Sequence, residues 1–249
     1  MLKIAVAGAT GAMGEKIVER AEATGHTVVK MSRSEGVDLL EGTGVVEALE
    51  GVDAIIDASQ VGDPTAKDVV SPILQGAQNL LDAAKKQNVH RLVMLSINGV
   101  EKPELQEFPF YKARFEQERL FEDARKDVEI CIVRSVQWYE FVLNPAASEV
   151  SDAEVKVQDW AIQPAPMDAV AAYMVEAAEG KYGEGLCVVA GGERLTLPEL
   201  TERYLEAIGD SRKVTTVDAV LPALADGSLY APGNATVLEP TLEEWLKQQ

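Results

Sequence analysis

Cysteine and histidine are scarce in this chain of 249 residues, which has two of each. Cys131 and Cys187 each lie inside an apolar run that is typical of a strand, so we expect buried, reduced thiols rather than a disulfide. His26 and His90 are isolated from each other and from both cysteines. Because a metal centre needs several such ligands together, the sequence indicates no metal site.

Basic residues are also few, with 23 Lys and Arg against 41 Asp and Glu and a formal net charge of −18. A nucleic-acid partner needs clustered basic side chains, so we expect none. No run of about eighteen apolar residues is present, and we expect no membrane partner. The start of the chain lacks the basic region, apolar stretch and cleavage site of a secretory signal. We therefore expect a cytoplasmic protein.

The opening of the chain carries the strongest positive signal. Residues 2–7 form a short apolar run that predicts a buried strand of a parallel sheet, and a helical pattern begins after the glycines that follow. A turn without Cβ atoms lets the backbone approach a pyrophosphate, while the free N–H groups of the helix face the anion. This context predicts a dinucleotide-binding turn; the alternative is a tight turn that binds no ligand. The turn comprises Gly8, Ala9, Thr10, Gly11, Ala12, Met13 and Gly14. At Gly11 we expect a β-branched side chain to fill the pyrophosphate space and to resist a positive φ.

The end of the second predicted strand, residues 26–31, bears on the choice of dinucleotide. An acidic residue there would accept a hydrogen bond from the ribose of NAD, whereas an arginine accommodates the 2′-phosphate of NADP. Arg33 stands nineteen residues after the last glycine of the turn, between Ser32 and Ser34. These residues favour NADP(H), with NAD(H) as the second candidate; the alternative is a solvated arginine in a turn. Asp38 is either an acceptor for the adenine amino group or an ordinary loop carboxylate.

The chain as a whole alternates strands and helices with short connections, which predicts parallel strands and right-handed crossovers. The expected strands are residues 2–7, 26–31, 53–58, 89–95 and 128–133, and the expected helices after the first are 46–49, 69–84 and 115–124. Ala58 and Ser59 leave the carboxyl end of the third strand, the edge where such sheets bind ligands, so they are candidate cofactor contacts.

The regular alternation of strands and helices stops at about residue 135, and residues 144–166 are expected to be irregular. Later elements are expected at 168–179, 185–190, 197–209, 212–217 and 241–248. We therefore predict an α/β fold of Rossmann type, a doubly wound parallel sheet with a small C-terminal substrate-binding cap. The whole chain, 1–249, would form a single NAD(P)-binding domain, with cap elements drawn mainly from about 135–166 and 191–249.

Several stretches in the expected order resemble the atypical short-chain dehydrogenase/reductase superfamily, in its NmrA-like, NAD(P)-binding branch. They are residues 8–14, 95–100, 110–114, 133–141 and 239–246. The resemblance covers nearly the whole chain and is more specific in the first half than in the cap. It implies a Rossmann-type fold, a nicotinamide dinucleotide and an oxidoreductase activity.

The same resemblance implies a catalytic Ser, Tyr and Lys, in which the Lys lowers the pKa of the Tyr and holds a ribose. In this register Phe110 stands at the tyrosine position and Arg114 at the lysine position. Arg114 keeps a positive charge and can still hold a ribose, but Phe110 has no proton to give. Tyr111 is adjacent, about 100° further around a helix. Ser96 matches the family serine approximately; its alternative role is a helix or turn cap. The catalytic candidates are Ser96, Tyr111 and Arg114, of which Ser96 and Arg114 are also candidate cofactor contacts.

Two hypotheses for the function follow. In the first, the protein reduces a small planar carbonyl or quinone with NADPH, because a quinone takes its proton from solvent and the cofactor carries the hydride chemistry. The aromatic residues Trp138, Tyr139 and Phe141 would then line a flat substrate, unless they pack in the core of the cap. In the second, the protein is a non-catalytic dinucleotide sensor or regulator of NmrA type that acts through a protein partner. Neither hypothesis leads us to expect activity on secondary alcohols.

Overall fold

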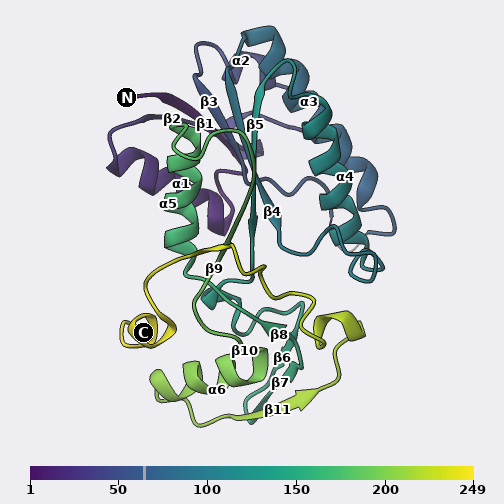
Figure 1. Ribbon diagram of the computed structural model, residues 1–249, viewed down its shortest axis with the longest axis vertical. Coiled ribbons are helices and arrows are strands. Elements are labelled where there is room, and N and C mark those ends of the chain that lie inside the picture. The colour runs from purple at the N-terminus through teal and green to yellow at the C-terminus, as the bar shows by residue number, and fades with distance from the viewer. Residues whose placement is uncertain (64–65) are drawn as a thin grey trace. The chain divides into compact units, whose positions relative to one another are not determined.

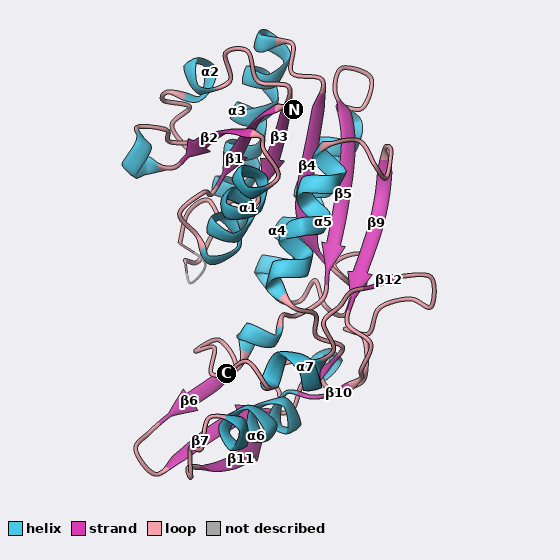
Figure 2. Cartoon of the chain, turned by 90° about the vertical axis from the view of Figure 1, so that its left-hand side faces the viewer, coloured by secondary structure: helices cyan, strands magenta, loops and turns pink. Residues whose placement is uncertain are grey.

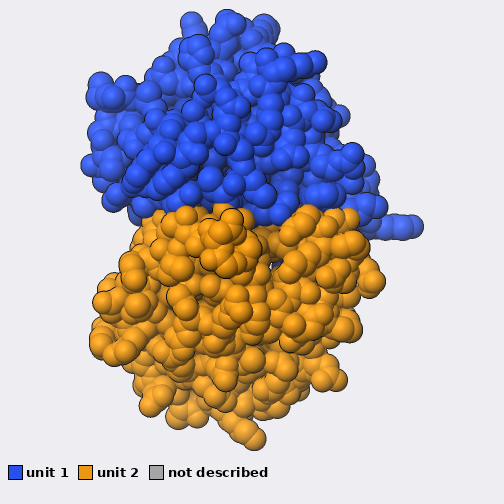
Figure 3. Space-filling view, viewed as in Figure 1, with its two compact units in different colours: residues 1–96, 108–134, 171–187 blue, residues 97–107, 135–170, 188–249 orange. Residues whose placement is uncertain are grey.

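The computed structural model describes residues 1–63 and 66–249. The chain divides into two compact units, which Figure 3 colours separately. The first unit comprises residues 1–96, 108–134 and 171–187, and the second comprises residues 97–107, 135–170 and 188–249. The segments predicted to supply a cap belong to the second unit.

The central sheet has seven strands in the order β12-β9-β5-β4-β3-β1-β2. Their bounds are β1 (Lys3–Ala7), β2 (Thr27–Met31), β3 (Ala54–Asp57), β4 (Arg91–Ile97), β5 (Glu129–Ser135), β9 (Gly185–Ala190) and β12 (Thr236–Val237). The pairs β1–β2, β1–β3, β3–β4 and β9–β12 run parallel. Because β1 has β2 on one side and β3 on the other, the strand order reverses beside β1, at the point where such sheets bind ligands.

Helices cover both faces of this sheet, as the Rossmann-type prediction requires, and that prediction is confirmed. Figure 1 shows α1 and α5 on one side of the strands and α3 and α4 on the other. Their bounds are α1 (Ala12–Ala23), α3 (Val70–Gln87), α4 (Pro109–Asp123) and α5 (Met167–Ala178); α2 (Val45–Ala48) is a single short turn. Among the described residues, no helix is both long enough and apolar enough to cross a membrane.

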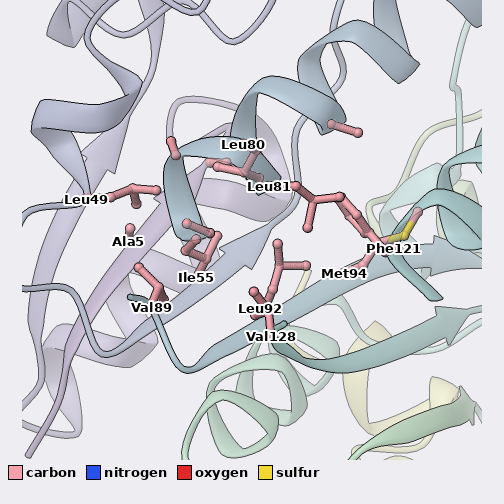
Figure 4. Packing of buried hydrophobic residues seen from close by; sticks show 14 of the residues in the cluster. Ala5, Leu49, Ile55, Leu80, Leu81, Val89, Leu92, Met94, Phe121 and Val128 are labelled. Carbon is pink, nitrogen blue, oxygen red and sulfur yellow. The ribbon is translucent and has the colours of Figure 1, made fainter. Parts of the chain in front are cut away.

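The core of the first unit lies between the sheet and α3 and α4 (Figure 4). Leu80 and Leu81 of α3 and Phe121 of α4 are almost completely buried, as are Ile55 and Leu92 of the facing strands. Burying one such side chain stabilises the fold by roughly 1.5–3 kcal/mol. The helical spacing of the apolar residues in α3 and the apolar strands therefore account for the position of this core.

The start of α4 differs from the sequence prediction, which placed it at residue 115. The helix begins at Pro109, because a proline in the first turn has no N–H to lose there and its fixed φ suits a helix. This correction places residues 110–114 inside the helix, where they form its first turns.

The prediction that residues 144–166 are irregular is also wrong. They contain the short strands β6 (Ser148–Val150), β7 (Glu154–Gln158) and β8 (Ala161–Ile162). In β7 the buried Val155 and Val157 flank the exposed Lys156, the two-residue period of a strand with one covered face.

The second unit builds its own small sheet around β7, in the order β11-β7-β6, with α6 against β7 and β11 (Figure 2). Its remaining elements are β10 (Leu195–Thr196), α6 (Leu197–Ala207), β11 (Lys213–Val217), a 3₁₀ turn at Pro222–Leu224 and α7 (Leu242–Leu246). Thr196 and Thr241 each open a helix with a capping box, a local sequence signal that fixes where α6 and α7 begin.

Candidate functional site

The three glycines of the turn after β1 have different structural roles. Gly8 has a φ of +78°, and a Cβ there would lie 2.7 Å from the Cα of Ser59 and 2.8 Å from the carbonyl oxygen of Ala58. A Cβ on Gly14 would lie 2.0 Å from the carbonyl oxygen of Gly8. Gly11 is exposed and extended, with a φ of −83°, and its Cβ would meet that same oxygen at 3.4 Å. The expected positive φ is therefore found at Gly8, and the argument that placed it at Gly11 is wrong.

The turn leaves the start of α1 open. Gly11 is the N-cap and supplies no side-chain hydrogen bond, and the N–H of Glu15 donates to the Gly11 carbonyl oxygen at 2.9 Å. The N–H groups of the first turn, from Ala12 to Gly14, have no carbonyl behind them within the helix. Together with the helix dipole, they favour an anion at this end of α1. Thr10 and Gly11 are exposed beside it, whereas Ala9 and Met13 are buried.

The end of β2 lies next to this turn, because the N–H of Gly8 donates to the carbonyl oxygen of Met31 at 3.0 Å. Arg33 follows in a 3₁₀ turn (Arg33–Glu35) and is exposed. Its side chain forms no hydrogen bond or ion pair with any part of the chain that the structure describes. The hydroxyl oxygens of Ser32 and Ser34 are 2.8 Å apart. Arg33 and the two serines therefore directly follow the strand end that is bonded to the glycine turn.

Asp38 already has backbone partners. Its Oδ1 accepts hydrogen bonds from the N–H groups of Leu40 at 2.9 Å and Glu41 at 3.2 Å. These bonds are those of an ordinary Asx turn, in which the carboxylate shapes its own loop.

A buried polar network crosses from β3 to α4, and sequence reasoning missed two of its members, Asp57 and Gln117. Asp57 Oδ1 accepts hydrogen bonds from the N–H of Ser59 at 3.0 Å and from its hydroxyl at 2.6 Å. The amide nitrogen of Gln117 donates to Asp57 Oδ2 at 2.9 Å, and Arg114 Nη1 donates to Gln117 Oε1 at 2.7 Å. The available signal was Asp57 itself, an acidic residue that closes an otherwise apolar strand.

The guanidinium of Arg114 is buried, with 6% of the residue exposed. Burial lowers the pKa of Arg114 from its ordinary value, and the nearby charges of Asp57 and Glu118 act in the opposite direction. Glu118 itself forms a buried two-point ion pair with Arg134, at 2.9 and 2.6 Å. Because an arginine is not deprotonated in proteins, Arg114 is a buried cation.

In the first unit, two buried side-chain atoms near the carboxyl edge of the sheet have no hydrogen-bond partner in the described part of the chain. The hydroxyl of Ser96, near the end of β4, and the Nε of Arg114 have no hydrogen-bond partner among residues 1–63 and 66–249. Buried polar atoms nearly always have a hydrogen-bond partner, so these two exceptions need an explanation. A ligand that supplies an acceptor would explain both.

Two aromatic residues precede Arg114 in α4, Phe110 and Tyr111. Phe110 packs against the small apolar cluster of Val69, Ile73 and Ala113, and the Arg114 guanidinium carbon lies 5.7 Å from its ring centre. Tyr111 is buried, and its ring meets that of Phe108 edge-on at 5.9 Å.

The aromatic residues after β5 belong to the second unit, where two of them pack on other rings. The ring of Tyr139 lies 5.4 Å from that of Trp245, and Phe141 lies 5.5 Å from Trp160. Burial raises the pKa of Tyr139 to about 12. The indole N–H of Trp138 donates to the Ser135 hydroxyl at 3.0 Å.

Residues 8–180 match the model of the NAD(P)H-binding family, so the chain belongs to that family. A photosystem II assembly factor of Synechocystis, Ycf39, is 30% identical over 110 residues, which are 39% of this chain. That match spans about a third of the relative, 34% of its length.

Solved structures share the fold over nearly their whole length. A UDP-N-acetylglucosamine 4-epimerase of Bacillus cereus has a TM-score of 0.74 at 17% identity. The match covers 100% of this chain and 98% of the epimerase chain. A short-chain dehydrogenase/reductase superfamily protein of Agrobacterium tumefaciens with bound NAD has a TM-score of 0.75 at 16% identity, with coverages of 99% and 95%. An NADPH-dependent quinone oxidoreductase of Escherichia coli, complexed with NADPH, has a TM-score of 0.71 at 17% identity, with coverages of 98% and 99%. The family model confirms the predicted NAD(P)-binding family, and these solved structures show the predicted fold.

The residues present fit a nicotinamide dinucleotide. The cradle at Gly8 and Gly14 has no room for a Cβ, and the open start of α1 is suited to a pyrophosphate. The unpaired Ser96 hydroxyl and Arg114 Nε are donors of the kind that ribose and carbonyl oxygens accept.

Proposed function

We propose that the protein binds NADP(H) along the carboxyl edge of the sheet and reduces a quinone or another planar carbonyl acceptor. The observation that carries the choice of NADP(H) is the exposed, unengaged Arg33 between two serine hydroxyls, next to the glycine turn. A guanidinium is well suited to a 2′-phosphate, and no carboxylate occupies residues 32–34 to select the ribose of NAD.

In this proposal the turn from Gly8 to Gly14 holds the pyrophosphate, and Ser32, Arg33 and Ser34 hold the 2′-phosphate. Ala58 and Ser59 border the ligand, and Arg114 donates to the second ribose. Asp38 Oδ1 accepts two backbone hydrogen bonds within its own loop, and its carboxylate stays a candidate acceptor for the adenine amino group. Bound NADPH supplies the hydride; the protein supplies orientation and exclusion of water.

The proposed class of hydride acceptor follows from the lack of an acidic side chain at Phe110. Phe110 has no ionisable group, and a quinone does not need one because solvent can supply its proton. Ser96 keeps a buried hydroxyl free to donate to a carbonyl oxygen. We propose Ser96 and Arg114 as the main catalytic candidates and keep Tyr111 as the third, although its burial against Phe108 separates it from solvent.

The direct experiment is NADPH oxidation with a panel of benzoquinones, naphthoquinones and planar aldehydes. We expect turnover with at least one class of acceptor, a loss of apparent NADPH affinity in Arg33→Ala, and little change in Arg20→Ala. Arg20 is a matched control because it is an exposed arginine near the other end of α1. Equal effects of the two variants would contradict the assignment of Arg33.

A non-catalytic dinucleotide sensor is the second candidate. It is favoured by Phe110 in its apolar cluster, which leaves no side-chain acid at that position. The Synechocystis relative is named as an assembly factor, and a role in assembly calls for a protein partner rather than turnover. NADPH binding without oxidation by any acceptor in the panel would support this second function and exclude the first.

A further inference from the structure

The hydrogen-bonded chain that joins β3 to α4 offers an inference about how Arg114 is held. We propose that Gln117 is a positioning residue that fixes the Arg114 guanidinium for the half of a dinucleotide lying over β3 and β4. The chain from Ser59 through Asp57 and Gln117 to Arg114 is called the Asp57 relay here. This inference rests on the proposed dinucleotide binding and deepens it.

The contacts of the Asp57 relay leave Gln117 little freedom. Its side-chain oxygen accepts a hydrogen bond from Arg114 at 2.7 Å, and its side-chain nitrogen donates one to Asp57 at 2.9 Å. Only 2% of Gln117 is exposed, and Asp57 is held in turn by two hydrogen bonds from Ser59. A buried amide that is hydrogen-bonded through both its oxygen and its nitrogen has one orientation. Its oxygen then fixes the position of the guanidinium nitrogen that donates to it.

The same contacts leave one donor of Arg114 unused. Gln117 engages Nη1, while Nε is buried and has no partner in the described part of the chain. A donor desolvated in this way costs about 1–3 kcal/mol unless an acceptor arrives. A guanidinium held at one end and unpaired at another is therefore arranged for an incoming oxygen atom rather than for the stability of the fold alone.

The strand order indicates which part of the ligand supplies that oxygen. The pyrophosphate turn follows β1, and Arg33 follows β2, on one side of β1. β3 and β4 lie on the other side; β3 ends at Asp57, and Ser96 is the residue before the end of β4. A dinucleotide whose 2′-phosphate is at Arg33 must then lay its second mononucleotide over β3 and β4, since the two halves bind on either side of the switch point.

The test compares two probes that share the adenosine 2′-phosphate but differ in the second mononucleotide, NADPH and adenosine 2′,5′-bisphosphate. In Gln117→Met, which keeps the length of the side chain but removes both hydrogen bonds, we expect about tenfold weaker NADPH binding, the value of one hydrogen bond to a charged group. Binding of the bisphosphate should stay within about twofold of the wild type, because it does not reach the relay. Calorimetric titration measures both affinities without turnover.

Gln87→Met is the matched control. Gln87 is the last residue of α3, and its amide donates to the Val46 carbonyl oxygen at 2.9 Å, so the same substitution removes one hydrogen bond away from the relay. It should leave both affinities unchanged. If Gln117→Met does not fold, Asp57→Asn replaces it: loss of the carboxylate charge should give the same selective weakening.

The outcomes separate the two levels of the proposal. A wild-type protein that binds neither probe refutes the proposed function itself. A wild-type protein that binds both, with variants that weaken both equally or neither, refutes the positioning role of Gln117 and leaves dinucleotide binding intact. Selective loss of NADPH affinity in Gln117→Met, with the control unaffected, supports the positioning role.

Discussion

Substitutions at Gly11 and Gly14 should separate ligand binding from stability, although the two glycines belong to one motif. A Cβ on Gly14 would approach three backbone atoms: the Gly8 carbonyl oxygen at 2.0 Å, the Gly8 carbonyl carbon at 2.7 Å and the Ala9 Cα at 2.9 Å. None of these is the end of a flexible side chain, so the backbone of the turn and the start of α1 must move apart. We expect Gly14→Ala to cost about 3 kcal/mol, the upper part of the range for overpacking.

Gly11 presents the opposite case. Its φ of −83° and ψ of 160° are allowed for any residue, and a Cβ there meets one oxygen at 3.4 Å. Loss of a glycine from the unfolded chain favours folding by about 0.4–1 kcal/mol, and loss of glycine at an N-cap disfavours it by a similar amount. Gly11→Val should therefore change stability by less than about 1 kcal/mol. Its side chain would occupy the approach to the start of α1 and should weaken NADPH binding at least about 100-fold, the value of two charge-assisted hydrogen bonds.

Thermal unfolding with and without NADPH measures both effects in one experiment. For a protein of this size, Gly14→Ala should lower Tm by about 6–12 °C, while Gly11→Val should stay within about 4 °C of the wild type. The wild type should gain about 2.7 kcal/mol of stability at a hundredfold excess of NADPH over its Kd, and Gly11→Val should gain almost none. A Gly11→Val protein that folds and keeps the wild-type Tm increase with NADPH would refute the assignment of the turn.

Three further predictions concern the cofactor, the substrate and the thiols. NADPH should bind the wild type at least about tenfold more tightly than NADH, and Arg33→Ala should remove most of that difference; equal wild-type affinities would contradict the role of Arg33. NADP⁺-dependent oxidation of secondary alcohols should be absent, because Phe110 cannot act as a base; robust turnover would show that another group, such as Tyr111, does so. Burial raises the pKa of Cys131 from 9.0 to about 12, so the thiolate is scarce at pH 8; a disulfide reagent should label the partly exposed Cys187 first and Cys131 only on unfolding.

The sequence contained enough local information for the strands, the glycine turn and most helices. Apolar runs, glycine spacing and helical periodicity act over a few residues, and these are what determine β1, α1 and the stripe of α3. The start of α4 was not predicted: the helix begins at Pro109, and the prediction began it at residue 115. The alternation in β7 is only five residues long and lies among turn residues, and its strand was missed for that reason.

The Asp57 relay lay beyond such reasoning for a different physical cause. Asp57 and Gln117 are separated by 60 positions, and nothing local says that a carboxylate at the end of one strand meets an amide in a distant helix. The resemblance predicted that Arg114 stands at the position of the family lysine, but it could not predict that the arginine is buried, with Nη1 bonded to Gln117 and Nε without a partner in the described part of the chain.

The burial and bonding of Arg114 matter because an arginine and a lysine hold a ligand in different ways. A lysine has one ammonium group that can turn to face any acceptor, whereas a guanidinium is planar and works only when its plane is set. An arginine at this position therefore requires a partner that fixes the plane, and the structure contains one in Gln117. In the proposed register, Phe110 and Arg114 are then two separate changes from the family pattern. The first would remove a proton donor, whereas the second, with the Asp57 relay, would retain a charged donor for binding.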